Sequence, residues 1–255
     1  MIYKTVILEE RDGVALITLN RPDELNSVNR EMRTEILDVL KNLEDNSNIK
    51  VVIVTGAGRA FCAGADINEL KEARKDPELQ KFINKTLFTM TKAYYEFEKP
   101  IIGAINGVSA GDGSQWVLAF DINIASDKAS FGWPATYLGL LCPYGLIRLP
   151  VEVNRYRAKE VLMTRRYISA EEAVQWGFVS KVVPYDDLLD TAFELADEIK
   201  QMPPLSLKAI KKAVNWGMGG YELAEHIMIS LQCSDDAEEG ITAFLEKRKP
   251  IFTGR

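Results

Sequence analysis

Two glycine-rich segments, each placed directly after a short run of apolar residues, restrict the possible folds of this chain more than any other feature. The first follows VVIVTG at residues 51–56, and the second follows PIIGAING at residues 100–107. Short apolar runs of this kind are typical of strands covered on both faces of a sheet. Because a helical segment begins after each glycine loop, the pattern predicts two strand–loop–helix units. Each unit exposes backbone N–H groups at the positive end of a helix, where a phosphate, a carboxylate or a developing oxyanion can bind.

The first glycine loop also begins like a dinucleotide-binding motif. Gly56 and Gly58 supply the first two glycines of that motif, but Phe61 occupies the place of the third. Asp66, near the start of the next helix, would repel a pyrophosphate, and no strand ending in an acid follows at the usual interval. Dinucleotide binding is therefore disfavoured. Glycines that serve only tight turns remain the simpler explanation for either loop taken alone.

The segments around the two loops predict an α/β domain. KTVILEE and VALITLN, which flank a turn at Asp12 and Gly13, have the pattern of strands, as do INIAS and ASFG farther along. Asn29 is a candidate N-cap for a helix with apolar residues at helical spacing. Beyond Pro143 the chain is predicted to be largely helical, and one of these helices has a capping box at Ser169 and a stop at Gly177. The last predicted helices are DDLLDTAFELADEIK, PLSLKAIKKAVNWG and YELAEHIMISLQ.

Length and composition exclude several classes of protein. The 255 residues suffice for one large domain or two modest ones, and the net charge of -6 argues against a general nucleic-acid or membrane surface. No stretch approaches the ~20 apolar residues of a membrane span, and nothing marks the N-terminus for export, so a cytoplasmic location is expected. Three scattered cysteines and a single histidine, His226, predict neither disulfides nor a metal site. We expect His226 to be structural.

Five motifs in order along the chain resemble those of the enoyl-CoA hydratase/isomerase (crotonase) superfamily. They are ITLNRPDELNSVN, FCAGADINEL, KPIIGAINGVSAGDGSQWVLAFDINIASDKASFG, ISAEEAVQWGFVSKVVP and GITAFLEKRKPIF. The resemblance implies a crotonase-like spiral of ββα units over residues 1–195, with a helical region for trimerisation over residues 196–255. It also implies a homotrimer or a hexamer built from two trimers.

The resemblance further implies a coenzyme A thioester as the ligand, with no other cofactor. In this family the thioester oxygen lies between two backbone N–H groups, which here belong to Ala65 and Asp112. Two fixed dipoles aimed at one oxygen stabilise an enolate, and such a donor is worth ~3 kcal/mol of transition-state energy. The remaining residues expected to bind the substrate are Leu25, Ala63, Gly64, Asp66, Ile67, Asn68, Gly111, Trp133 and Ala135.

The chain departs from the pattern of the family's hydratases at the acidic residues. The two positions that carry glutamates in those enzymes are occupied here by Gln115 and Ala135, and a third acid position used by some relatives falls near Pro143. Asp112 stands where the family usually has glycine. An amide is not a general base at neutral pH, and each lost acid–base role typically costs ~10²–10⁴-fold in rate.

Three functions are compatible with these departures. The first is enolate chemistry that needs no carboxylate base, such as decarboxylation of a malonyl-type thioester in an apolar pocket lined by Trp116, Trp133 or Leu141, with Tyr144 as proton donor. Simple packing is the alternative role for Trp133 and Tyr144. The second function is an atypical hydratase or isomerase that uses another acid, with Asp112 as the first candidate and Gln115 to hold a water. The third is an acyl-CoA binding protein without catalytic activity.

Overall fold

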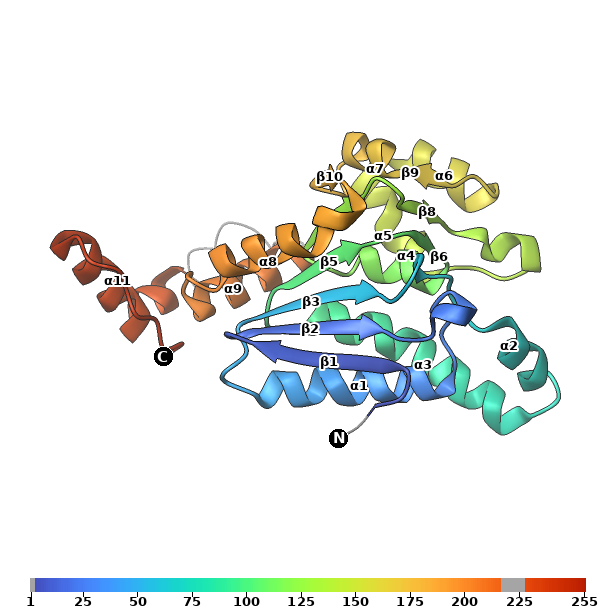
Figure 1. Cartoon of the computed structure of the whole chain (residues 1–255), viewed down its shortest axis with the longest axis horizontal. Coiled ribbons are helices and arrows are strands. Elements are labelled where there is room, and N and C mark those ends of the chain that lie inside the picture. Colours follow the sequence, from blue (N-terminus) through green and yellow to red (C-terminus); the bar gives the residue numbers. More distant parts are fainter. Residues whose placement is uncertain (1–2, 217–227) are drawn as a thin grey trace.

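In the computed structural model the main sheet has six strands in the order β1-β2-β3-β5-β7-β10, and Figure 1 shows β1, β2, β3 and β5 side by side. The structure describes residues 3–216 and 228–255. Strands β1 and β2 are antiparallel, and every other neighbouring pair in this sheet is parallel. The six strands are β1 Val6–Arg11, β2 Val14–Leu19, β3 Val51–Gly56, β5 Ile101–Ile105, β7 Ile122–Ser126 and β10 Lys181–Val183.

A second, four-stranded sheet lies at the end of the first, in the order β4-β6-β8-β9. Its strands are β4 Ala60–Cys62, β6 Val108–Ala110, β8 Ser130–Gly132 and β9 Ile168–Ser169. The chain crosses from the first sheet to the second three times, from β3 to β4, from β5 to β6 and from β7 to β8, and helices follow each crossing. These repeated ββα units form the predicted spiral, so the α/β fold class is confirmed.

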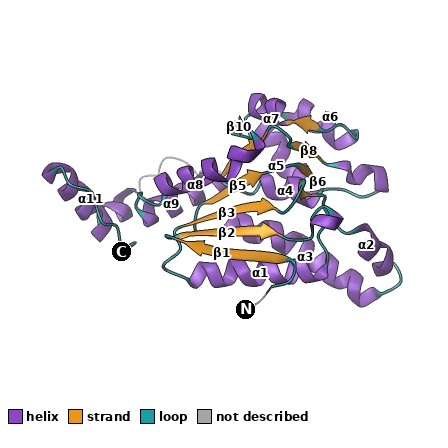
Figure 2. Ribbon diagram, in the orientation of Figure 1, coloured by secondary structure: helices purple, strands orange, loops and turns teal. Residues whose placement is uncertain are grey.

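Helices cover both faces of the main sheet, as Figure 2 shows. Along β3, Val52 and Val54 pack into the larger core cluster, which includes α1 Arg30–Asp45 and α3 Pro77–Glu96. The alternating residues Val51 and Ile53 pack against α8 Leu188–Ile199 on the other face. All six residues of β3 are buried, which confirms the prediction of a strand covered on both sides.

The remaining helices are short and connect or flank these layers. They are η1 Pro22–Glu24, α2 Ile67–Ala73, α4 Asp112–Val117, η2 Pro134–Leu138, α5 Pro143–Val153, α6 Arg155–Met163, α7 Ala170–Trp176, η3 Tyr185–Asp187, α9 Pro204–Trp216 and α11 Asp235–Glu246. The Asn29 side chain caps α1 by accepting from the N–H of Met32, and α7 begins with the predicted capping box at Ser169. The part of the predicted helix YELAEHIMISLQ up to Ile227, which includes His226, lies outside the described residues.

Two features define the C-terminal region. In α9, the buried Lys211 ammonium lies 2.7 Å from the carboxylate of Asp121, which attaches this helix to the core. Beyond it, α11 projects from the body of the molecule and exposes Phe244 and Leu245, which are 84% and 74% accessible (Figure 1). The family resemblance implies a spiral core that ends at residue 195 and a helical trimerisation region that begins at residue 196. Helix α8 spans this boundary, and the division remains a prediction.

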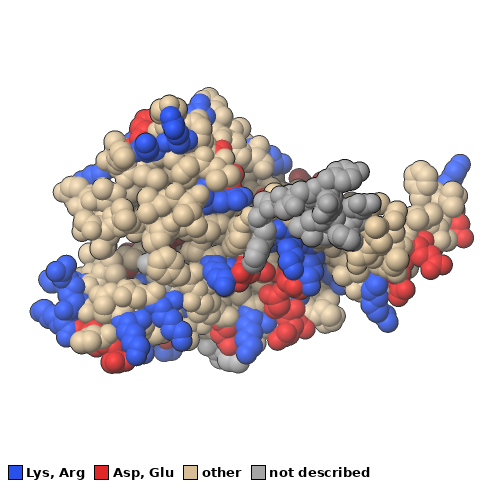
Figure 3. Space-filling view, turned by 180° about the vertical axis from the view of Figure 1, so that it is seen from behind, with Lys and Arg blue, Asp and Glu red and all other residues tan. Residues whose placement is uncertain are grey.

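Charged side chains of both signs are mixed along the edge of the molecule in Figure 3. No helix in the described part of the chain is both long enough and apolar enough to cross a membrane.

Two buried asparagines hold the loop between β3 and β4. Asn26 donates to the carbonyls of Ala57 and Ala60, at 2.9 and 2.8 Å, and Asn106 donates to the carbonyl of Gly58 at 2.9 Å. The Asn106 side-chain oxygen also accepts from the N–H of Gly56 at 3.1 Å. Buried backbone groups need such partners because an unpaired one costs much of its hydration free energy.

We predict that Asn106→Ala lowers the free energy of unfolding by about 2 kcal/mol, because it leaves the buried N–H of Gly56 without its partner. Equilibrium urea unfolding followed by tryptophan fluorescence measures the loss. The control is Asn42→Ala, because the Asn42 amide forms only exposed hydrogen bonds. Equal effects of the two substitutions would contradict the role given to Asn106.

Candidate active site

The two glycine loops meet at Gly64, where a side chain would not fit. A Cβ atom on Gly64 would lie 2.8 Å from the carbonyl oxygen of Ala110 and 3.4 Å from the backbone nitrogen of Asp112, and its φ of 92° also favours glycine. Gly113 is constrained in the same way, because its Cβ would lie 2.5 Å from the carbonyl oxygen of Cys62. The loops after β4 and β6 therefore lie in direct contact.

Two backbone N–H groups, those of Ala65 and Asp112, lie at the contact of the loops. Val28 and Ala65 form an isolated parallel β-bridge. Its two hydrogen bonds run from the N–H of Val28 to the carbonyl of Gly64 and from the N–H of Asp66 to the carbonyl of Val28, so neither uses the N–H of Ala65. Asp112 is the first residue of α4, so it has no earlier helical carbonyl to bond. Within residues 3–216 and 228–255, neither the Ala65 N–H nor the Asp112 N–H donates a hydrogen bond. Both are available to a ligand.

Ser114 fixes the orientation of α4 at this point. Its hydroxyl donates to the carbonyl of Ser109 at 2.8 Å and accepts from the N–H of Gly132 at 3.2 Å. In addition, the N–H of Gly111 donates to the carbonyl of Gly132 at 3.0 Å. These bonds tie α4 to strands β6 and β8, so the Asp112 N–H is held by rigid elements.

The carboxyl group of Asp112 is buried, being 7% accessible, and accepts a hydrogen bond from the Gln115 amide at 3.0 Å. Burial raises the pKa of Asp112 above its ordinary value, although the positive charge of Arg33 and the bond from Gln115 partly oppose this. The thiols of Cys62 and Cys142 lie close enough to feel this carboxylate, and burial raises the pKa of each to about 12. Asp112 is therefore biased towards its protonated form.

The Gln115 side chain forms hydrogen bonds through both its oxygen and its nitrogen. Its side-chain oxygen accepts from the N–H groups of Tyr144 and Gly145, at 2.8 and 3.4 Å, while its nitrogen donates to Asp112. The amide thus connects the start of α4 to the start of α5. Sequence reasoning treated Gln115 as a holder of water, whereas the structure shows a residue that positions Asp112 and Tyr144.

An apolar pocket of about 260 Å³ opens between α3 and α5, with Gln115 and Tyr144 in its wall. The Tyr144 ring packs against Tyr95 at 5.8 Å, and burial raises the pKa of Tyr144. In the described part of the chain the buried Tyr144 hydroxyl has no hydrogen-bond partner. The α3 side of this pocket consists of Phe88, Thr91, Lys92 and Tyr95, which were not among the expected site residues although they recur at the spacing of one helix face.

The other residues expected at the site fall into two groups. On the side of the first loop, Leu25 accepts from the N–H of Ala63 at 2.9 Å, so these two residues are adjacent, and Ile67 and Asn68 are exposed at the start of α2. On the side of the second, Ala135 lies beside Cys142, to whose sulfur its backbone N–H donates.

The tryptophans and Leu141 differ in their surroundings. Trp133 is 2% accessible and its ring packs edge-on against Phe178. Trp116 is buried against Tyr94, whereas Leu141 is exposed. The packing role that was the alternative for Trp133 agrees with these contacts. These contacts do not place Trp116, Trp133 and Leu141 together in the wall of one apolar pocket.

A larger cavity of about 380 Å³ lies beneath α9, where Asp121 and Lys211 form part of its wall. None of its lining residues belongs to either glycine loop. Size alone therefore does not mark the candidate active site, and we place the site at the contact of the two loops because that is where free donors and a buried carboxyl group meet.

Comparison with known proteins agrees with this architecture. Residues 9–255 match the family described as Enoyl-CoA hydratase/isomerase. The chain is 38% identical over 258 residues to the short-chain-enoyl-CoA hydratase of Clostridium acetobutylicum, covering 98% of this chain and 97% of that one. It is 36% identical over 251 residues to the 1,2-epoxyphenylacetyl-CoA isomerase of Escherichia coli, covering 95% and 96%.

Solved structures show the same similarity. The enoyl-CoA hydratase of Bacillus anthracis superposes with a TM-score of 0.91 at 32% identity, covering 99% of this chain and 100% of that one. The chain belongs to the enoyl-CoA hydratase/isomerase family and has the crotonase fold. It is a crotonase-family enzyme acting on acyl-CoA.

We predict that Asp112→Asn stabilises the protein at neutral pH and that the gain disappears in acid. A carboxyl group whose pKa is raised by folding contributes its full stability below its unfolded pKa and loses it as the pH rises through the folded pKa. Asparagine keeps the bond from Gln115 but cannot ionise, so it avoids this loss. The melting temperatures of the two proteins should therefore converge near pH 4 and diverge as the pH is raised.

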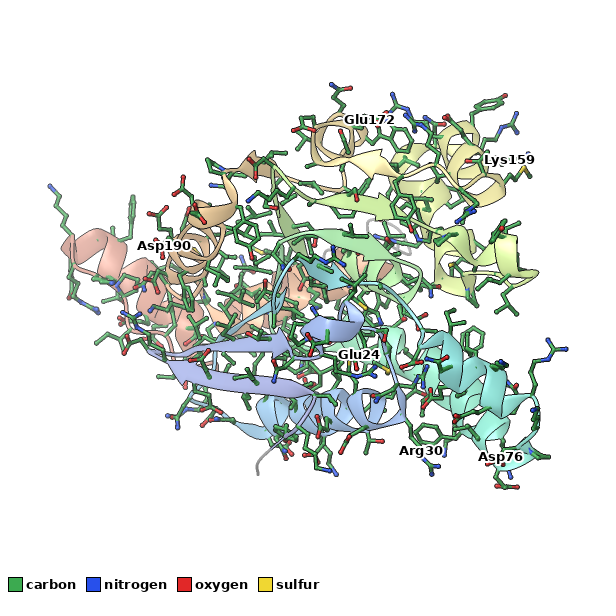
Figure 4. All side chains as sticks on the ribbon, turned by 45° about the vertical axis from the view of Figure 1, so that its right-hand side comes forward. Glu24, Arg30, Asp76, Lys159, Glu172 and Asp190 are labelled. Carbon is green, nitrogen blue, oxygen red and sulfur yellow. The ribbon has the colours of Figure 1, made fainter. Side chains whose placement is uncertain are left out.

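The matched control is Asp190→Asn, because Asp190 is exposed and Figure 4 places it at the outside of α8. This variant should not show a gain that grows between acid and neutral pH. If Asp112→Asn is destabilising at neutral pH, the Asp112 carboxylate is stabilised in the folded protein and the direction given above is wrong.

Proposed function

We propose that this protein stabilises the enolate of a coenzyme A thioester between the N–H groups of Ala65 and Asp112. The observation that carries this proposal is the contact of the two glycine loops at a point where, among the described residues, the N–H groups of Ala65 and Asp112 have no acceptor. Such donors stabilise an oxyanion strongly because they are already oriented before the charge develops. The residues from Ala63 to Asn68 and Leu25 would line the path of the coenzyme, which is part of the substrate.

We infer further that the chemistry uses one carboxyl group. Hydration needs a base for water and an acid for the α-carbon, but Gln115 is engaged in hydrogen bonds and Ala135 offers only a methyl group. Asp112 carries a buried carboxyl group at the start of α4, where the two loops meet, and its raised pKa suits a proton donor. The Tyr144 hydroxyl, buried in the adjoining pocket, is the alternative donor.

Two reactions require only one such group. In decarboxylation of a malonyl-type thioester, the C–C bond to the carboxylate breaks, its electron pair forms the enolate and Asp112 delivers a proton to the α-carbon. In a double-bond shift, ionised Asp112 removes a proton from the α-carbon and the resulting acid returns it at the γ-carbon. Both reactions need only the two N–H groups that bind the oxyanion and the carboxyl group of Asp112.

The experiment that tests the proposed function is turnover of three thioesters, with products identified by mass. Malonyl-CoA reports decarboxylation, 3-butenoyl-CoA reports isomerisation and crotonyl-CoA reports hydration. We expect one of the first two to react, and Asp112→Asn to slow that reaction by ~10²–10⁴-fold while the thioester still binds. Undiminished turnover by this variant would show that Asp112 is not the proton donor. Tyr144 would then be the candidate donor, and Tyr144→Phe tests it.

Binding is measured separately by calorimetry and thermal shift with acetyl-CoA. Absence of heat and of thermal stabilisation would remove the basis of the proposal, because a ligand of the folded state must stabilise it. Binding without turnover of any thioester would support the acyl-CoA binding protein instead.

We predict that hydration of crotonyl-CoA is several orders of magnitude slower than in a relative with both glutamates. The paired substitution Gln115→Glu with Ala135→Glu should raise the rate, whereas each single change should do much less because the two acids act as a unit. A steady-state assay following loss of the enoyl chromophore compares wild type, both single variants and the double variant. Fast hydration by the wild type would contradict the proposed one-carboxyl chemistry.

We also propose a homotrimer or a hexamer. The exposed apolar side chains of α11 and its continuation (Ile241, Phe244, Leu245 and Ile251) exceed what a peripheral helix of a monomer usually presents to water. Light scattering at micromolar concentration measures the mass, and a monomer would refute this proposal.

A further inference from the structure

Arg33 on α1 is a buried cation whose hydrogen-bonding capacity is largely unused. Its side chain is 0% accessible, and one terminal nitrogen, Nη1, pairs with the carboxylate of Glu69 on α2. In the described part of the chain, the other two nitrogens, Nε and Nη2, have no hydrogen-bond partner. A buried guanidinium with unpaired donors is costly, because it has lost water without gaining an acceptor.

The two unpaired nitrogens form one edge of the guanidinium group. Nε and Nη2 donate in parallel on the same side, which matches the two oxygens of a carboxylate. Nη1, on the other side, is the nitrogen that Glu69 occupies. Arg33 therefore presents a complete bidentate donor pair, already oriented by its ion pair with Glu69.

This donor pair belongs to the region of the candidate active site. Glu69 lies in α2, directly after the loop from Ala63 to Asn68, and its other oxygen accepts from the N–H of Arg30. The positive charge of Arg33 also acts on the carboxyl group of Asp112. Asp112 does not hydrogen-bond to Arg33, since its accepted bond comes from Gln115, which Tyr144 and Gly145 hold in turn.

We propose that Arg33 binds a carboxylate carried by the acyl group, so that the substrate is the monothioester of a dicarboxylic acid. This inference rests on the proposed thioester site and names its substrate class. A carboxylate paired with an arginine is stabilised against loss as CO2, so the group bound by Arg33 is one that the reaction keeps. The proposal accordingly favours the double-bond shift over decarboxylation and places the carboxylate away from the α-carbon.

The test compares matched pairs of thioesters that differ in one terminal group. Glutaryl-CoA is compared with valeryl-CoA, and succinyl-CoA with butyryl-CoA, by calorimetry on the full-length protein. We expect the wild type to bind at least one carboxylated ester about tenfold or more tighter than its neutral counterpart, in line with charge-assisted bidentate bonds. Arg33→Met should abolish this preference and leave the affinity for the neutral ester within about threefold.

The controls separate Arg33 from general charge and from folding. Arg157→Met removes an exposed cation that lies over Trp176, and it should leave the preference unchanged. Glu69→Gln removes the negative charge beside Arg33 but keeps an amide oxygen that can accept from Nη1 and so preserve the orientation of Arg33. This variant should keep or increase the preference, so it tests the proposal even if Arg33→Met does not fold. Figure 4 shows Arg30, one turn earlier, pointing outward, which distinguishes it from the buried Arg33.

Each outcome has one meaning. If the wild type binds none of the four esters, the proposed thioester site fails. If it binds both members of each pair equally, the thioester site stands and the role of Arg33 is overturned. A preference that survives in folded Arg33→Met, or one that is lost in Glu69→Gln, also overturns the role of Arg33.

Discussion

The candidate site depends on the need to pair every buried polar group of the backbone. A glycine loop that turns inside a protein carries carbonyl and N–H groups that no helix or strand satisfies. Here Asn26 and Asn106 supply partners for the first loop, and the Ser114 hydroxyl supplies them at the second. Because these side chains fix both loops, the unpaired N–H groups of Ala65 and Asp112 are held in place rather than lost to internal bonds.

Burial then decides what the polar side chains near these donors can do. The pKa of Asp112 is raised because burial removes most of the hydration of its carboxyl group, and Gln115 donates a hydrogen bond to that group. Arg33 is buried as well, and two of its nitrogens have no hydrogen-bond partner among the described residues. A site with one carboxyl group of raised pKa and one arginine paired on a single side suits chemistry different from that of two opposed glutamates, even though the scaffold is that of the family.

Much of this could be predicted from local sequence. The run VVIVTG predicted a strand buried on both faces, because β-branched apolar residues without alternation fit only that environment, and β3 is buried throughout. Asn29 and Ser169 predicted helix starts through a local capping bond, and both bonds are present. Helix α4 begins at Asp112, directly after Gly111, whose positive φ ends the second loop.

The sequence by itself determined the fold class, the family and the two loops, because each follows from contacts between residues close in the chain or from ordered motifs. Only the tertiary structure decided how the polar side chains are paired. Gln115 bonds to residues 29 and 30 positions away, and the pocket beside it combines one face of α3 with the start of α5. Arg33 occupies a buried position on a predicted amphipathic helix, and nothing within α1 shows that its partner is Glu69 or that two of its nitrogens stay unpaired. The physical reason is that pairing and burial are set by segments that meet only after folding.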